Sequence, residues 1–208
     1  MKKIVIVLAF VNGFFIAKAQ DENKPGEEKK GGFKKENLFV GGDITLGFGN
    51  SYTALGASPY FGYSLNKYVD VAVSFNFNYT SQRDFVVYGD KVRQTVYGPG
   101  AFVRVYPIKF LFAQAQFEHN FLKVKYLPAD NSGYPPPSTD HIDANSLLVG
   151  AGWAGGRSED NKSFYYISVS WDLIRNSNSP YVDGLGRAIP IIRAGYNIAL
   201  FQGGRYRR

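Results

Sequence analysis

The chain has 208 residues, a mass of 23.2 kDa and a formal net charge of +7, with 45% hydrophobic and 16% aromatic residues. This is too much apolar material for a disordered chain, and the length suits one domain. There is no Cys, which excludes disulfides, iron–sulfur clusters and thiolate zinc sites. After residue 20 no stretch reaches the roughly 18 consecutive apolar residues of a membrane-spanning helix.

Residues 1–20 have the layout of a cleaved signal peptide. Lys2 and Lys3 precede an apolar run over residues 4–16, and Ala17-Lys18-Ala19 supplies the small-residue cleavage pattern. Cleavage lowers the net charge from +7 to +4 because three lysines and no acid are lost. Such a small basic balance gives no reason to expect a nucleic-acid partner.

The segments at the two ends differ in composition from the middle of the chain. Residues 21–36 contain five acids, five lysines and one Phe, so we predict a flexible charged leader in the periplasm. A solvated linker and a partner-binding arm are both compatible with this composition. Residues 202–208 form a basic C-terminal tail.

Between these ends, residues 37–201 show the period-two alternation of β-strands. In the stretch from Val69 to Tyr79, six apolar side chains alternate with Asp70, an alanine and three further polar residues. Similar alternation predicts eight strands, over residues 38–48, 55–65, 69–79, 97–105, 111–121, 147–155, 165–173 and 192–200.

Eight alternating strands fit either a soluble sandwich or barrel with an apolar interior, or a membrane barrel with an apolar exterior. The polar faces carry Asn, Gln, Ser and acids but no Lys, which suits a hydrogen-bonded interior better than a surface exposed to water. We therefore predict an all-β, eight-stranded antiparallel up-and-down transmembrane barrel. Its expected lipid-facing residues include Val71, Val73, Phe75, Phe77, Ile167, Val169 and Trp171.

Connector lengths orient this predicted barrel. The turns at residues 65–68, 106–109 and 157–163 are short, whereas residues 80–95, 122–145 and 174–188 form longer connections. Bacterial membrane barrels have short periplasmic turns and long outer loops. The pattern therefore predicts a location in the outer membrane with both termini in the periplasm.

The export signal, the eight strands and the alternation of short turns and long loops resemble small outer-membrane barrels of Gram-negative bacteria, of the OmpA transmembrane-domain, OmpX and OmpW type. The last predicted strand is similar to the signal that the barrel-assembly machinery reads in this family, through Arg193, Gly195, Ile198 and Leu200. The chain departs from the family by continuing past Phe201. The resemblance implies partners in outer-membrane lipid and the assembly machinery, but no specific activity.

The interior positions of the predicted barrel include ionisable groups, which must be paired or hydrated. We predict a lumen network of ion pairs in which Arg193 lies near Asp43 and Asp172, and Arg104 lies near Asp70. Its members are Asp43, Asp70, Arg104, Glu118, Asp172 and Arg193. Because eight strands leave room for little more than side chains, we expect a plugged lumen, with an OmpW-like conduit for small apolar or ionic solutes as the alternative.

Two outer segments suggest a surface role. Residues 84–94 are predicted to form a hairpin that extends two strands beyond the membrane, and the likeness to OmpX suggests strand pairing there with other outer-membrane proteins. Tyr134-Pro135-Pro136-Pro137 is a stiff segment that fits either recognition or loop rigidity. A subunit of a larger outer-membrane complex is a further alternative.

Enzymatic sites have weak support. Some barrels that this chain resembles are lipid A deacylases or palmitoyltransferases, which need a Ser, a His and an acid. Glu118 and His119 are adjacent on a strand and face opposite sides, while Asp140, His141 and Asp143 form an acidic loop with weak metal-binding character. We predict a non-enzymatic structural or surface-interaction protein with no cofactor, metal or catalytic residues.

Overall fold

A computed structural model describes residues 33–48, 51–129, 136–158, 162–183 and 185–201. Within these residues a short 3-10 turn, η1 (Lys35–Asn37), precedes eight strands. The strands are β1 (Leu38–Phe48), β2 (Tyr52–Ser64), β3 (Val69–Arg83), β4 (Lys91–Ile108), β5 (Leu111–Leu127), β6 (Ser138–Gly155), β7 (Phe164–Asp172) and β8 (Ile191–Ala199). No helix in this part of the chain is long and apolar enough to cross a membrane.

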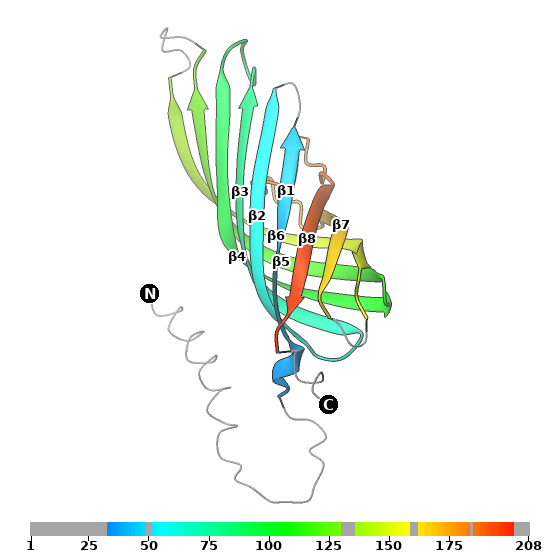
Figure 1. The fold of residues 1–208 in the computed structure, drawn as a ribbon. Helices are drawn as coiled ribbons and strands as arrows, with labels where there is room; N and C mark the ends of the chain where they lie inside the picture. Colours follow the sequence, from blue (N-terminus) through cyan, green and yellow to red (C-terminus); the bar gives the residue numbers. More distant parts are fainter. Residues whose placement is uncertain (1–32, 49–50, 130–135, 159–161, 184, 202–208) are drawn as a thin grey trace, which may run out of the picture. The chain divides into compact units, whose positions relative to one another are not determined.

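The strands close into an antiparallel up-and-down barrel (Figure 1). Each strand pairs with the next along the chain, and β1 pairs with β8 through a register that runs from Phe39 opposite Ala199 to Ile44 opposite Ala194. Closure removes the free edges that an open sheet would present. The fold class predicted from the alternation is thus confirmed.

The strands differ greatly in length, and Figure 1 shows β3 to β6 extending past the ends of β7 and β8. The extensions beyond the predicted strands cover residues 80–83, 91–96, 122–127 and 138–146. Residues 122–145 are therefore not one long connection, because β5 and β6 are separated by residues 128–137 alone. His141, expected in a loop, lies on β6 opposite Lys123.

The period of two places alternate side chains inside and outside the barrel, as burial along β4 and β5 shows. Two inward glycines are required by close backbone approach. A Cβ at Gly98 would collide with the backbone carbonyl of His119, and one at Gly150 would collide with that of Val169. These positions let neighbouring strands bend toward each other without a side chain between them.

Candidate functional site

The first centre inside the barrel is Arg104, whose side chain is 1% exposed. Its guanidinium carbon lies 4.2 Å from the ring centroid of Tyr166 and 4.6 Å from that of Phe102. The rings of Phe112 and Tyr60 lie at 5.0 Å and 5.4 Å. A desolvated guanidinium is stabilised by such ring faces, and no acid among the described residues forms an ion pair with this cation.

Inward polar side chains of β5 connect this centre to a second one. The Arg104 Nε donates to Gln114 Oε1 at 2.6 Å, and Gln114 Nε2 donates to Gln116 Oε1 at 2.7 Å. Gln116 Nε2 then donates to Glu118 Oε1 at 2.8 Å. Residues two apart on a strand share a face, so the alternation of β5 produces this chain of hydrogen bonds. We call it the β5 ladder.

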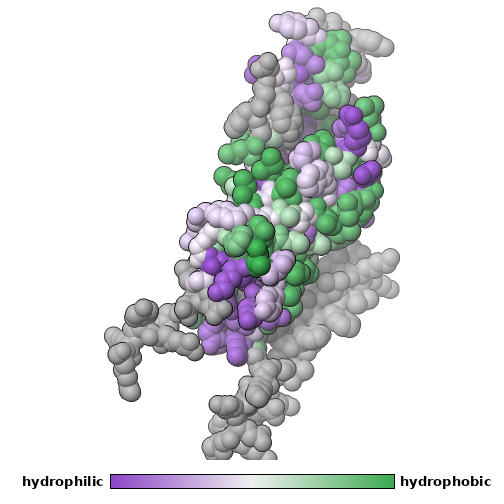
Figure 2. Space-filling view, turned by 90° about the vertical axis from the view of Figure 1, so that its right-hand side faces the viewer, coloured by the Kyte–Doolittle hydropathy of each residue, from purple (hydrophilic) through white to green (hydrophobic). Residues whose placement is uncertain are grey.

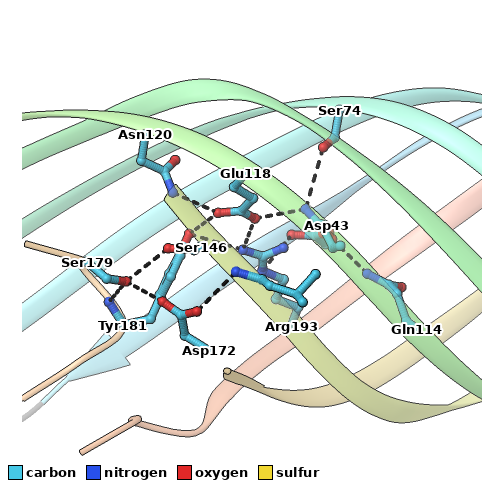
Figure 3. Close-up of polar contacts among 12 residues, drawn as sticks. Asp43, Ser74, Gln114, Glu118, Asn120, Ser146, Asp172, Ser179, Tyr181 and Arg193 are labelled. Atoms are coloured by element: carbon cyan, nitrogen blue, oxygen red, sulfur yellow. Dashed lines mark hydrogen bonds and ion pairs between the residues drawn. The ribbon is translucent and has the colours of Figure 1, made fainter. Parts of the chain in front are cut away.

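The second centre is Arg193 on β8, which is also buried (Figure 3). Its Nη2 lies 3.0 Å from Glu118 Oε1, and its Nε lies 3.7 Å from Asp43 Oδ1. Glu118 also accepts hydrogen bonds from the Asn120 amide at 3.0 Å and the Tyr181 hydroxyl at 2.7 Å. Arg193 thus pairs with Glu118 at hydrogen-bond distance and lies near a second carboxylate, while neutral donors stabilise the remaining negative charge on Glu118.

The connection between β7 and β8 enters the lumen at the end opposite the short turns. Tyr181 reaches Glu118 and accepts a hydrogen bond from Arg193 Nη2 at 3.3 Å (Figure 3). Ser179 donates to Asp172 Oδ2 at 2.7 Å, and its Oγ is 3.0 Å from that of Ser146. This connection therefore covers the second centre, and we call residues 174–190 the plug loop.

The predicted lumen residues do not form one ion-pair network. Arg193, Asp43 and Glu118 come together, but among the described residues Asp70 forms no ion pair with Arg104 and Asp172 forms none with Arg193. Asp70 lies opposite Arg104 in the strand register, yet the described side chains form no ion pair between them. The guanidinium turns to the rings and to Gln114 instead.

Asp172 anchors the plug loop and has no ion pair with Arg193 in the described part of the chain. It accepts the Leu147 backbone N–H at 3.0 Å and the Ile174 N–H at 3.1 Å, in addition to the Ser179 hydroxyl. Tyr181 and Ser179 could not be predicted as lumen residues, because a loop has no periodicity that separates inward from outward side chains.

The outer wall carries an apolar belt, formed by the outward side chains of residues 38–46, 55–63, 69–79, 97–105, 111–121, 147–153, 165–173 and 192–198. None of these outward side chains is Asp, Glu, Lys or Arg. The belt contains all seven residues predicted to face lipid, and Figure 2 shows hydrophobic residues over the middle of the wall.

Aromatic side chains mark both ends of the belt. At the short-turn end, the rings of Trp153 and Tyr165 are 5.5 Å apart, and Tyr165 lies opposite Tyr196. At the other end, the rings of Tyr97 and Phe121 are 5.7 Å apart. Paired girdles of this kind are typical of proteins that span a bilayer with strands.

The residues of the suggested assembly signal lie at the barrel seam. Arg193 and Gly195 face inward on β8, whereas Ile198 is exposed on the wall. Leu200 follows the strand, and its N–H donates to the Leu38 carbonyl at 2.8 Å, across the seam between β8 and β1.

Neither histidine is part of a hydrolytic constellation among the described residues. His119 faces outward, and its Nδ1 lies 2.7 Å from Asn145 Oδ1. No hydrogen bond found in the described ranges joins His119 or His141 to a Ser. These ranges also contain no group of three or more His, Asp or Glu residues placed to hold a metal ion.

The carboxylates of Asp84 and Asp90 hold the turn between β3 and β4. Asp90 accepts the backbone N–H groups of Phe85, Val86 and Val87 at 2.6, 2.9 and 3.0 Å, and the Tyr126 hydroxyl at 3.1 Å. Desolvation opposes ionisation of Asp90, but these donors outweigh it and lower its pKa below the ordinary value. The turn is thus a fixed structure on the extension of the barrel.

Comparisons with known proteins find no matching family model and no matching curated protein. Among solved structures, the chain resembles Ail of Yersinia pestis, with 12% identity, coverage of 77% of this chain and 96% of that chain, and a TM-score of 0.44. It also resembles the N-terminal β-barrel domain of Pseudomonas aeruginosa OprF, with 16% identity, coverage of 78% of this chain and 95% of that chain, and a TM-score of 0.40. For Neisserial surface protein A the identity is 11%, the coverage is 78% of this chain and 97% of that chain, and the TM-score is 0.43. These likenesses concern the fold alone.

Proposed function

We propose that the chain is a non-enzymatic outer-membrane barrel with a structural or surface-interaction role. The observation that supports this most is the uncharged apolar belt around a closed barrel. A soluble monomer rarely exposes a contiguous apolar patch above roughly 600 Å². In a bilayer the same wall is favourable, because a closed barrel satisfies its backbone hydrogen bonds internally.

The height of the belt also fits a bilayer. On β3 the belt runs from Val69 to Tyr79, and ten residue steps of about 3.4 Å give roughly 34 Å along the strand. A strand tilt of about 40° reduces this to roughly 26 Å along the barrel axis, close to the ~25 Å apolar band of outer-membrane barrels.

The filled lumen supports a structural role over the alternative of a conduit. The Arg104 ring cage and the Arg193 cluster are both buried, and Tyr181 of the plug loop covers the second. A solute would have to displace hydrogen-bonded ions at both centres, which costs several kcal/mol per uncompensated charge. Reconstituted protein should show no conductance above the detergent control, and steady ion currents would instead support the conduit.

A surface-interaction role is supported by the extended strands. β3 to β6 continue beyond the belt, and the part of β6 from residue 138 to 146 pairs with β5 but, in the described chain, has no strand pairing with β7. We infer that this end faces outside the cell, with both termini in the periplasm. The hairpin at 84–94 would then meet other outer-membrane proteins, either transiently or within a larger complex.

The absence of Cys allows a direct test of this orientation. Single cysteines would be placed at Val86 on the hairpin, at Lys67 in a short turn and at Val73 in the belt. A bulky, membrane-impermeant maleimide applied to intact cells should label the Val86→Cys variant alone. The Lys67→Cys variant should react only after the outer membrane is opened, and the Val73→Cys variant should resist labelling until the protein is unfolded.

Labelling at Lys67→Cys but not Val86→Cys in intact cells would contradict the orientation. Rapid labelling of the Val73→Cys variant in membranes would contradict the belt as a lipid-facing surface. The barrel-assembly machinery is the proposed partner during insertion, and an Ile198→Asp variant should accumulate unfolded in the periplasm if β8 carries its signal.

A further inference from the structure

The hairpin between β3 and β4 ends in four consecutive apolar residues that project from the barrel. Phe85 is 55% exposed, Val86 64%, Val87 47% and Tyr88 92%. They lie on the extension of the sheet, beyond the apolar belt of the wall. We call Phe85 to Tyr88 the apolar tip. Lipid around the barrel does not account for it.

The apolar tip is built to stay exposed. Asp90, which is fully buried, accepts three of its backbone N–H groups, and Asp84 accepts the Gly89 N–H at 2.6 Å. Gly89 has a φ of +92°, which lets the chain turn back without the strain a side chain would add. Because the turn is already ordered, binding through it costs little conformational entropy.

Cations lie directly beneath the apolar tip. Arg83 and Lys91 face each other at the base of the turn, and Arg93 follows on β4 beside Lys125 of β5. Within the described ranges, none of these four side chains forms an ion pair or a hydrogen bond with an acid. The acids of the turn are occupied, since Asp84 and Asp90 are bonded to backbone N–H groups.

The spacing of the two features matches a lipid surface. The residues of the apolar tip lie two to five residue steps from Arg83 along the chain, a reach of no more than about 7–18 Å. Interfacial segments bury their apolar residues roughly 5–10 Å deep, with cations at the headgroups. Tyr88 is suited to this depth because its ring is apolar and its hydroxyl polar.

The small size of the apolar tip favours lipid over protein as its occupant. Two aromatic and two valine side chains, with exposures between 47% and 92%, offer less than the ~800 Å² per partner that a standard protein interface buries. Insertion into a bilayer needs no matching pocket and scales with whatever apolar area enters.

We propose that the apolar tip and the cations beneath it bind an anionic lipid surface opposite the membrane that holds the barrel. This inference rests on the proposed surface role, and it assigns the apolar tip a lipid partner in place of the outer-membrane proteins proposed for the hairpin as a whole. Tip insertion would supply apolar contact, and Arg83, Lys91 and Arg93 would contact acidic headgroups.

The test uses the full chain in nanodiscs of phosphatidylcholine, mixed with vesicles and separated by flotation. Vesicles with about 30% phosphatidylglycerol should carry the nanodiscs upward, whereas phosphatidylcholine vesicles should not, because only the first are anionic. A Val86→Asp/Tyr88→Asp variant should bind about tenfold more weakly or worse, since it removes apolar area and adds repulsive charge. An Arg83→Gln/Lys91→Gln/Arg93→Gln variant should lose the preference for anionic vesicles.

The matched control is Leu185→Asp, which changes another exposed apolar residue, 78% exposed, on the plug loop. It should float like the wild type, and heat-dependent gel mobility should show all variants folded. Equal flotation of the wild type and the Val86→Asp/Tyr88→Asp variant would overturn the proposal. Failure of the wild type to float with anionic vesicles would also overturn it and leave an acidic protein as the occupant. Cysteine labelling in cells reports orientation independently, so failure of the surface role is recognised separately.

Discussion

Replacing Arg193 by Met should destabilise the barrel more than any other single change in the lumen. The substitution removes the cation 3.0 Å from Glu118 and 3.7 Å from Asp43, and the hydrogen bond to Tyr181. Both carboxylates stay buried, with exposures of 0% and 8%. Removing one partner of a buried ion pair costs about 3–5 kcal/mol, and two carboxylates are left here, so we expect the upper half of that range.

A double-mutant cycle separates the lost contact from the penalty of the stranded charge. Glu118→Gln alone leaves Arg193 with Asp43, so it should cost less than Arg193→Met. Adding Glu118→Gln to Arg193→Met removes one stranded carboxylate, and the double variant should be more stable than the sum of the singles by about 1–3 kcal/mol.

The measurement is urea unfolding of lipid-reconstituted protein, followed by the fluorescence of its two tryptophans. The matched control is Arg187→Met, because Arg187 forms an exposed ion pair with Asp183 at 2.8 Å. That variant should unfold at the same urea concentration as the wild type, since exposed pairs contribute little. An Arg193→Met midpoint within error of the control would refute the view that the lumen charges are held by mutual compensation.

Three further outcomes follow from the geometry. Gly98→Ala should cost about 1–3 kcal/mol by forcing a backbone shift, whereas Gly42→Ala, with its nearest atom at 3.5 Å, should leave the same urea midpoint unchanged. The lowered pKa of Asp90 implies that its ionised form stabilises the hairpin fully above pH 3.8. That stability is lost as the pH falls toward the lowered pKa, so hairpin amide protection should be flat from pH 7 to about 5 and drop below 3.8. In planar bilayers neither the Tyr181→Ala variant nor the Arg104→Ala variant should conduct, because each substitution leaves the other lumen centre filled. Current through either variant would contradict the view that the two centres block the lumen independently.

The strand pattern was predictable wherever one face is apolar and the other polar. Residues 38–48 match β1 in full, and β7 and β8 differ from prediction by one residue at each end. The outer parts of β4 and β5 were missed because their outward positions carry Arg93, Lys123 and Lys125. With polar side chains on the outside, the contrast between faces is lost, although the backbone pairing continues.

The lumen was predictable as a set of inward residues but not as a set of contacts. Alternation identified Arg104 and Asp70 as inward neighbours, yet side-chain length and the surrounding rings direct the guanidinium to Gln114. Partner choice depends on rotamers and on loops, and Tyr181 enters the lumen from a segment without periodicity. Register therefore indicates which residues share a level, and packing decides which of them bond.

The two tryptophans lie on the wall at opposite ends of the belt, so their fluorescence can report depth in the bilayer. Trp153 lies opposite Ile167, and Trp171 is four residues further along β7, roughly 13 Å along the strand. Each ring should therefore sample its own leaflet. A lipid-borne quencher confined to one leaflet should dim one tryptophan and spare the other, reporting insertion and its direction without any label on the protein.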